Sequence, residues 1–219
     1  MPPGITKSED SYLDPYRRAL LSFGAGFEAT LWSSREGQHL RFDVMLDMAP
    51  FEGAAVLDLG CGSGDFAAYM IERRVGFRHY IGIDALPAQI EAARARALPN
   101  CEFLVGDFIA HPHVLDPLES ELICISGSLN TMRQEVAQAV ILRAWRQARR
   151  GIVFNFLSDR APARLLETDL HPAVRFNTIA MIDWALTLSP RVRFRQDYLD
   201  GHDATIAIDR HIDLHAAAL

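Results

Sequence analysis

The sequence predicts an α/β fold: a three-layer sandwich around a seven-stranded, mostly parallel sheet with an antiparallel terminal hairpin. Three observations support this prediction. Short apolar segments alternate with segments of helical periodicity between residues 54 and 157, as in parallel sheets that helices cover on both faces. A glycine-rich turn joins the first of these strands to the helix that follows it. Two further strands near the end of the chain are separated by a short loop that suits a hairpin.

Length and composition favour one domain over the whole chain, residues 1–219. Hydrophobic residues make up 49% of the sequence and charged residues 23%, which is close to the average of globular domains. We expect residues 1–50 to form a helical cap and residues 51–158 to form the core. Residues 159–219 are expected to contribute a helical insertion and the terminal hairpin.

The first elements follow from their apolar patterns. Two segments with helical periodicity, residues 16–23 and 36–48, precede a buried strand at 54–59. In residues 65–74 the apolar side chains share one stripe of a helix, and Gly76 suits the position just past its end.

The middle of the chain continues the same alternation. After a strand at 80–83, a proline that suits the first helical turn opens an Ala-rich helix over residues 87–99. Residues 101–105 and 122–125 are predicted strands, and an amphipathic helix follows from about residue 136 to 149.

The last elements depart from the parallel pattern. A fifth apolar strand at 151–157 is followed by residues 161–188, which we expect to hold one short and one longer helix. The hairpin strands are predicted at 192–198 and 205–208.

Charge and cysteine content exclude some functions. The net charge of -6 disfavours a general nucleic-acid binder, because affinity for the phosphate backbone comes from a surplus of Lys and Arg. The arginines near residues 143–150 lie at a predicted helix end and are interpreted as a solvated face. The three cysteines, Cys61, Cys101 and Cys124, lack the spacing of a zinc site or a disulfide framework.

The sequence shows neither a membrane-spanning segment nor a secretion signal. No apolar run reaches the length of about 18 residues that a membrane span needs. Residues 1–11 are polar and lack a basic stretch followed by an apolar one. We therefore expect a cytoplasmic protein.

The most informative segment is Asp58-Leu59-Gly60-Cys61-Gly62-Ser63-Gly64, where a buried strand runs into a glycine turn and a helix N-terminus. Glycines permit positive φ angles and leave no Cβ between backbone and ligand, while free amides at a helix start favour an anionic group. A dinucleotide-binding turn would have a glycine three residues after Gly62, where this chain has Asp65. The turn therefore indicates a cofactor site, and Asp65 disfavours a dinucleotide.

Two aspartates end the neighbouring predicted strands. Asp84 follows the second strand, twenty residues after Gly64, where open α/β sheets place a carboxylate over ribose hydroxyls. Asp107 ends the third strand. Because the carboxyl ends of adjacent parallel strands open onto one crevice, we expect these carboxylates and the glycine turn to converge.

Through this glycine segment, Gly82-Ile83-Asp84 and Gly106-Asp107-Phe108, the sequence resembles the class I S-adenosylmethionine-dependent methyltransferases, whose fold is Rossmann-like. The resemblance covers about residues 52–158, and the terminal hairpin is similar to the sixth and seventh strands of that fold. A more distant resemblance, carried by Trp32, Gln38, Arg41-Phe42 and residues 126–130, is to small bacterial members of unassigned substrate.

The resemblance implies S-adenosyl-L-methionine as cofactor and a role for nine residues. It implies that the methionine part is held by Gly60, Cys61 and Gly62, and the ribose hydroxyls by Asp84. Ala85 and Leu86 would lie against the adenine, and Asp107 would accept from its exocyclic amine with Phe108 alongside. Ser126 would face the methyl group.

No catalytic residue is assigned, because the base in this family varies with the methyl acceptor, and no metal is expected. The segment after the fourth strand lacks the Asn/Asp-Pro-Pro-Tyr element that similar enzymes use to methylate amino nitrogens. His171 and His202 are candidate bases, although each position is more typical of a surface histidine. Trp32 is a candidate for shielding a sulfonium by a cation-π contact.

Three more polar residues, Tyr16, Asn130 and Asn155, are candidates for orienting an acceptor. The prediction is an enzyme that methylates a small-molecule acceptor, with nucleic acid and membranes as disfavoured partners. Two alternatives stay open: a nicotinamide-dependent oxidoreductase on a similar fold, and a methyltransferase-like module that binds the cofactor without catalysis.

Overall fold

The computed structural model describes residues 12–116 and 118–210. The polar start, residues 1–11, on which the expected absence of a secretion signal rests, lies outside the described residues. The strands are β1 (Ala55–Leu59), β2 (His79–Asp84), β3 (Cys101–Val105), β4 (Leu122–Ile125), β5 (Gly151–Ser158), β6 (Arg175–Phe176), β7 (Val192–Arg195) and β8 (Asp203–Asp209).

The helices come before the sheet, between its strands and in the segment after β5. They are α1 (Asp14–Phe23), α2 (Arg35–Met48), α3 (Asp65–Glu72), α4 (Pro87–Ala95), α5 (Gln134–Gln147), α6 (Ala163–Leu166) and α7 (Thr178–Leu188), with short 3-10 turns η1 (Phe27–Thr30), η2 (Pro112–Leu115) and η3 (Leu199–Gly201). In the described part of the chain, none of them is long and apolar enough to cross a membrane.

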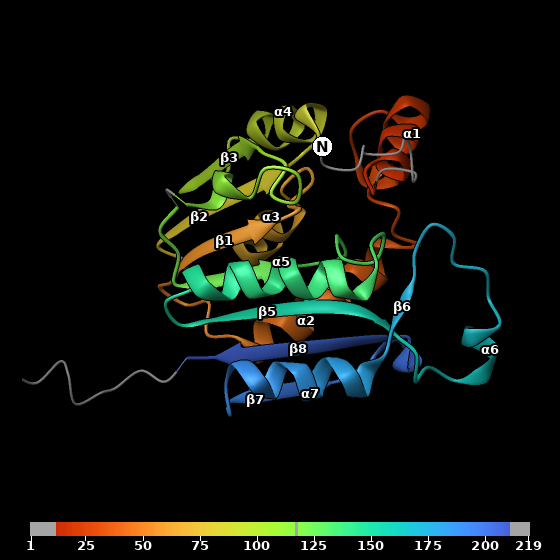
Figure 1. Ribbon diagram of the computed structural model, residues 1–219. Helices are drawn as coiled ribbons and strands as arrows, with labels where there is room; N and C mark the ends of the chain where they lie inside the picture. Colours follow the sequence, from red (N-terminus) through yellow and green to blue (C-terminus); the bar gives the residue numbers. More distant parts are fainter. Residues whose placement is uncertain (1–11, 117, 211–219) are drawn as a thin grey trace, which may run out of the picture.

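The strands form one sheet in the order β3-β2-β1-β4-β5-β8-β7 (Figure 1). Strands β1 to β5 pair in parallel, whereas β8 runs antiparallel to both β5 and β7. This confirms the predicted fold class. The chain moves outward from β1 to β2 and β3 and then returns to β4 on the other side of β1, so the strand order reverses between β1 and β4. Ligands of open α/β sheets bind at such a reversal.

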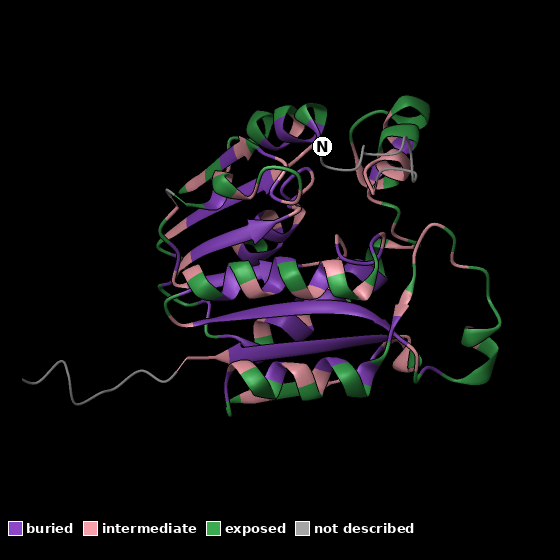
Figure 2. Cartoon of the chain, in the orientation of Figure 1, coloured by how far each residue is buried: buried purple, intermediate pink, exposed green. Residues whose placement is uncertain are grey.

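Helices cover both faces of the sheet, which confirms the three layers. On one face β-strand side chains pack with α5 and α7, through residues such as Ile141 and Met181. On the other face they pack with α2, α3 and α4, through residues such as Phe42, Phe66 and Ile90. Figure 2 shows the central strands buried and the outer faces of the helices exposed.

The short strand β6 is an element that the sequence pattern did not predict. It pairs with the last two residues of β5, Leu157 and Ser158. Strand β4 pairs only with residues 151–154 of β5, so the end of β5 has a free edge. A two-residue strand that fills this edge leaves no periodicity in the sequence.

Two predicted helix ends are wrong. Helix α3 stops at Glu72, and the residue with a left-handed backbone after it is Arg74 (φ 59°) instead of Gly76. The earlier end lets Val75 and Phe77 pack against the core on that face. Helix α4 stops at Ala95, four residues before Pro99, and Ala97 takes a positive φ of 48°.

Candidate functional site

A cavity lies where the carboxyl ends of β1 to β4 meet the segment before β1. The space between its walls, open solvent at the mouth included, is about 860 Å³. All nine residues to which a cofactor role was ascribed line it: Gly60, Cys61, Gly62, Asp84, Ala85, Leu86, Asp107, Phe108 and Ser126. The structure thus brings four separate segments together around one space.

The glycine turn after β1 is fixed to the end of β2. The amides of Gly60 and Cys61 both donate to the carbonyl oxygen of Ile83, at 2.8 and 3.0 Å. Gly62 has a φ of 52°, and no atom lies within 4 Å of the place where a Cβ would stand. Gly60 differs, because a Cβ there would lie 2.5 Å from the Cβ of Ser128. Gly60 therefore permits close packing, whereas Gly62 leaves open space beside the cavity.

Asp84 connects the glycine turn to the start of α4. One carboxylate oxygen accepts from the amide of Gly62 at 3.0 Å, and the other accepts from the amide of Leu86 at 2.9 Å. Burial raises the pKa of this carboxyl, while the two amide bonds act in the opposite direction. Each oxygen keeps a second lone pair, so the same side chain can hold the turn and accept from a ligand.

Asp107 closes the other side of the cavity. Its Oδ1 accepts from the amides of Ile109 and Ala110, at 3.1 and 2.8 Å, and from the hydroxyl of Tyr12. Burial, followed by the contact with Asp107, raises the pKa of Tyr12 well above its usual value. The aspartate thus orders the turn after β3 and ties the start of the described chain to it.

Three residues that line the cavity each have a buried side-chain oxygen with no hydrogen-bond partner among the described residues: Oδ1 of Asp58, Oε1 of Gln38 and Oε1 of Gln89. The other oxygen of Asp58 accepts from the hydroxyl of Tyr80. Burial raises the pKa of Asp58 to about 7. Because carboxylate and amide oxygens accept but do not donate, these oxygens favour a ligand rich in donors.

The sequence alone distinguishes Gln38 only through a distant resemblance, and Gln89 only as a polar residue in an Ala-rich helix.

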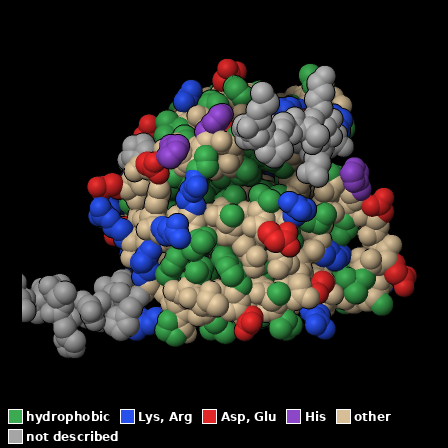
Figure 3. Space-filling view, in the orientation of Figure 1, with side chains coloured by type: hydrophobic (Ala, Val, Ile, Leu, Met, Phe, Trp, Pro, Cys, Tyr) green, Lys and Arg blue, Asp and Glu red, His purple; other side chains and the backbone are tan. Residues whose placement is uncertain are grey.

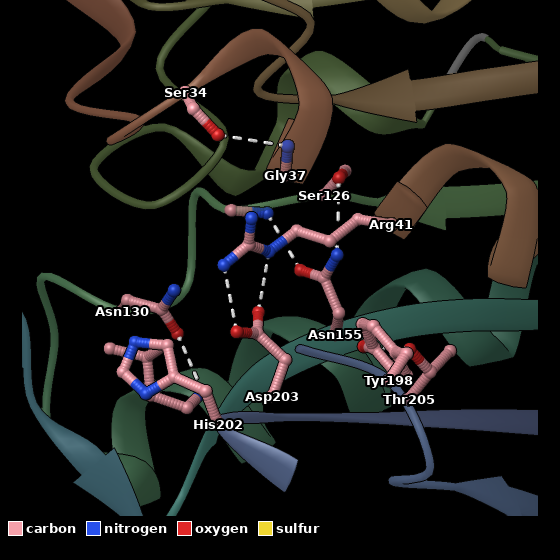
Figure 4. Close-up of polar contacts among 12 residues, drawn as sticks. Ser34, Gly37, Arg41, Ser126, Asn130, Asn155, Tyr198, His202, Asp203 and Thr205 are labelled. Carbon is pink, nitrogen blue, oxygen red and sulfur yellow. Dashed lines mark hydrogen bonds and ion pairs between the residues drawn. The ribbon is translucent and has the colours of Figure 1, made fainter. Parts of the chain in front are cut away.

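A buried ion pair lies next to the cavity, on the side of the turn after β4. Arg41 of α2 binds Asp203 of β8 through two bonds, Nε to Oδ2 at 2.6 Å and Nη2 to Oδ1 at 2.7 Å (Figure 4). The side chains are 5% and 0% exposed. The guanidinium also lies 4.2 Å from the centre of the Trp32 ring, which lines the cavity. The cation on Trp32 in the structure is therefore Arg41.

Asn155 shapes the turn after β4. Its side-chain oxygen accepts from the amide of Gly127 at 2.8 Å, and its side-chain nitrogen donates to Oγ of Ser126 at 3.2 Å (Figure 4). Gly127 has a φ of 77°, and a Cβ there would stand 2.3 Å from the Trp32 ring. Asn155 thus fixes the position of the Ser126 hydroxyl oxygen, and the hydroxyl hydrogen of Ser126 stays available for donation.

The remaining candidates divide into two groups. Tyr16 lines the cavity, and burial raises its pKa to about 12, so it is a protonated group near neutral pH. His171, His202 and Asn130 do not line the cavity. His202 is half-buried against Arg175, with 3.0 Å between Nδ1 and Nη2, and burial lowers its pKa. Asn130 accepts from the backbone amide of Leu157 at 3.2 Å.

The lining fits the cofactor that the sequence resemblance implies. S-adenosylmethionine carries donors along its length: an ammonium group, two ribose hydroxyls and an exocyclic amine. The cavity offers carboxylates at three strand ends, two further unpartnered amide oxygens, and open space beside Gly62. The acceptors of the lining match these donors in kind, and the turn leaves room for a ligand at the backbone.

A family model described as a methyltransferase domain matches residues 56–151. The match begins in β1 and ends at the start of β5, so it includes the glycine turn and both strand-end aspartates. No curated protein sequence matches the chain.

Several solved structures share the fold at low sequence identity. The SAH-bound magnesium protoporphyrin IX methyltransferase from Synechocystis PCC 6803 has a TM-score of 0.64 at 15% identity, over 92% of this chain and 95% of that one. A SAM-dependent methyltransferase from Archaeoglobus fulgidus has a TM-score of 0.63 at 16% identity, over 81% and 95%. The small RNA methyltransferase HEN1 has a TM-score of 0.66 at 13% identity, over 85% of this chain but 27% of that one.

The family match includes the strand ends that line the cavity but not the lining segment before β1, and the likeness to the solved structures extends over most of the chain. The nicotinamide alternative receives no support from these matches. Residues 56–151 thus match a methyltransferase-domain model, and the chain as a whole has the fold of the solved methyltransferases named above.

Proposed function

We propose that this protein is a class I S-adenosylmethionine-dependent methyltransferase that transfers the methyl group of S-adenosylmethionine to a small-molecule acceptor by in-line displacement. The observation that carries the proposal is the covering of the cavity by the segment before β1. Tyr12, Tyr16, Thr30, Trp32 and Gln38 all line it, and Figure 1 shows α1 on the side of the sheet to which β1 points. A site covered by a further segment of the chain suits a compact acceptor better than a macromolecule.

The residues around the cavity would divide the binding of the cofactor among them. Gly60, Cys61 and Gly62 would hold its methionine part, and Asp84 would accept from its ribose hydroxyls. At the other end the adenine would be bound by Ala85, Leu86, Asp107 and Phe108. When bound, the cofactor supplies a methyl group on a positively charged sulfur, and this sulfur is the leaving group when an acceptor atom attacks the methyl carbon.

The protein's contribution would be alignment and exclusion of water. Holding two reactants in line can lower a barrier by about 7 to 11 kcal/mol. Ser126, which Asn155 holds from behind, lies at the end of β4 with its hydroxyl available to orient an acceptor. Trp32 is fixed between Arg41 and Gly127 and forms an apolar wall.

Charge favours a small molecule over a nucleic acid as acceptor. Four carboxylates, those of Asp58, Asp65, Asp84 and Asp107, line the cavity, and they would repel a phosphate backbone. The arginines at residues 143–150 lie at the carboxyl end of α5 and in the loop that leads into β5. The amino end of β5 is at the opposite end of the strands from the cavity. Figure 3 shows Lys and Arg side chains gathered around the carboxyl end of α5. The solved neighbours include a porphyrin and an RNA methyltransferase, so the likeness does not choose between these acceptors.

A labelling experiment tests the acceptor class. The purified enzyme is incubated with methyl-tritiated S-adenosylmethionine and, separately, with the low-molecular-mass, RNA and protein fractions of a cell extract. Label is expected in the low-molecular-mass fraction, and label confined to RNA or protein would refute the proposal. With a chirally labelled methyl group, in-line displacement predicts inverted configuration in the product, whereas retention would exclude a single displacement.

Cofactor affinity is expected to depend on pH through Asp58. Its pKa of about 7 is raised above the unfolded value, so the buried carboxylate is protonated, and its charge lost, as the pH falls through 7. If the charged form binds the donor-rich ligand, affinity for S-adenosylhomocysteine at pH 6 is about tenfold lower than at pH 8. Calorimetric titration at both pH values measures this ratio.

Asp58→Asn is the matched variant for this measurement. It removes the titrating group and keeps the shape of the side chain, so the ratio between the two pH values should fall towards one. An unchanged ratio in Asp58→Asn would assign the pH dependence to another group, such as Asp84, whose pKa burial also raises.

A further inference from the structure

Helix α1 packs against the rest of the protein with little apolar burial. Of its residues 14–23, all of which the structure describes, only Ala19 is buried, whereas half of α2 is buried. Leu21 and Phe23 are 89% and 68% exposed, and Figure 2 shows most of α1 exposed or half-buried. Because burial of apolar surface is the main source of stability, such an element separates from the core at a low cost in free energy.

A short exposed linker joins α1 to the segment that follows it. The helix ends at Phe23, and residues 21–25 are exposed. Gly24 has a φ of 76°, and no atom lies within 4 Å of the place where its Cβ would stand. A glycine in open space can change its backbone angles without a clash, as a hinge residue must. The linker therefore allows α1 to move as one unit.

Two tyrosine hydroxyls fasten α1 to the strand ends around the cavity. Tyr12, two residues before the helix, donates to Oδ1 of Asp107, which follows β3. Tyr16, in the first turn, donates to the carbonyl oxygen of Gly127, which follows β4, at 3.5 Å. Both tyrosines line the cavity. Together these two hydrogen bonds form a latch.

The two bonds of the latch lie on opposite sides of the cavity. Strands β2 and β1 lie between β3 and β4 in the sheet, and Asp84 and the glycine turn are at the ends of these two strands. The chain from Tyr12 to Tyr16 thus crosses the cavity from the β3 side to the β4 side. It lies over the strand ends at which the cofactor is proposed to bind.

The bond from Tyr12 leaves Asp107 able to bind a ligand. Oδ1 of Asp107 accepts from Tyr12 and from the amides of Ile109 and Ala110, whereas its Oδ2 has no partner among the described residues. Each carboxylate oxygen accepts hydrogen bonds independently. The latch and a ligand can therefore use the same side chain at once, one through each oxygen.

We propose that α1 is a lid over the cavity, hinged at Gly24 and closed by the latch of Tyr12 and Tyr16. Ligand enters and leaves while the latch is open, and the latch forms both with and without ligand. It therefore controls the rates of binding and release more than the affinity. The choice of S-adenosylhomocysteine as the test ligand rests on the proposed function.

Stopped-flow measurement of S-adenosylhomocysteine binding, followed by tryptophan fluorescence, separates a lid from a ligand contact. Tyr12→Phe removes a hydrogen bond to a charged group, so the association and dissociation rate constants should both rise about tenfold. The 3.5 Å bond of Tyr16 is near the limit of hydrogen bonding, so Tyr16→Phe should raise both about twofold. The dissociation constant, which is the ratio of the two rate constants, should change less than about threefold in either variant.

Trypsin cleavage within α1 tests the latch without any ligand. Arg17 and Arg18 are exposed, and cleavage after them requires the helix to leave the core and unfold locally. The double variant Tyr12→Phe, Tyr16→Phe should be cut at these arginines about tenfold or more faster than wild type. Mass spectrometry of the fragments over time measures this rate.

Tyr69→Phe is the matched control. Its hydroxyl also donates to a carboxylate, that of Asp43 at 2.7 Å, but this bond joins α3 to α2, and Tyr69 does not line the cavity. The substitution should change neither the cleavage rate in α1 nor the two rate constants of ligand binding.

Two results would overturn the inference. Equal cleavage rates in α1 of the double variant and of wild type would exclude the latch. Faster release with an unchanged association rate would make the tyrosines ligand contacts and exclude a lid. If wild type does not bind S-adenosylhomocysteine, the proposed cofactor site fails, and the cleavage rates still decide whether the two tyrosines hold α1 in place.

Discussion

Gly62→Val is expected to abolish measurable binding of S-adenosylhomocysteine while the protein still folds. Gly62 has a φ of 52°, and the space where its Cβ would stand is empty for 4 Å, beside a cavity that the residue lines. A branched side chain there occupies the space of a ligand that approaches the backbone. The left-handed backbone would cost a side chain about 2 kcal/mol of stability. Calorimetric titration measures the first effect and urea unfolding the second.

Gly53→Val is the matched control for backbone strain. Gly53 also has a positive φ, of 68°, and no atom within 4 Å of an added Cβ, but it lies before β1 and does not line the cavity. It should lose similar stability and bind S-adenosylhomocysteine like wild type. Wild-type affinity in Gly62→Val would mean that the glycine turn is purely structural.

Arg41→Met is expected to destabilise the fold by about 3 to 5 kcal/mol. The substitution leaves Asp203, whose side chain is 0% exposed, without the cation that compensates its burial. It also removes the guanidinium from Trp32. Urea unfolding near neutral pH measures the loss. Because the whole stability of a domain is of order 5 to 15 kcal/mol, the variant is also examined by circular dichroism for retained structure.

Two further variants make this test specific. In Arg41→Met with Asp203→Asn, both charges are absent, so a large part of the stability should return. Arg193→Met breaks the partly exposed pair with Asp209, 46% and 29% exposed, and should cost less than about 1 kcal/mol. Equal, small losses in Arg41→Met and Arg193→Met would contradict the role given to the buried pair.

The parts of the fold and site that the sequence predicted are those with local signals. The glycine turn, Asp84 and Asp107 each follow an apolar strand, and the carboxyl ends of parallel strands meet at one edge of a sheet whatever packs around them. Ser126 could be placed for the same reason. Their positions in the cavity follow from the strand order alone.

What was missed depends on contacts between distant parts of the chain. Arg41 and Asp203 are 162 residues apart, and neither position differs in pattern from a surface charge. The unpartnered oxygens of Gln38 and Gln89 become visible only when the packing around them is known. The end of α3 moved for a similar reason, since packing of Val75 and Phe77 outweighs the preference of Gly76 for a left-handed backbone.

The cofactor site is tested most directly by thermal unfolding of the wild-type protein without ligand and with S-adenosylmethionine, S-adenosylhomocysteine or NAD. A ligand at a hundredfold excess over its dissociation constant adds about 2.7 kcal/mol, which for a chain of 219 residues raises the melting temperature by roughly 5 to 10 °C. We predict this shift with S-adenosylmethionine and S-adenosylhomocysteine and none with NAD. A shift with NAD alone, or no shift with either adenosyl ligand, would contradict the site described above.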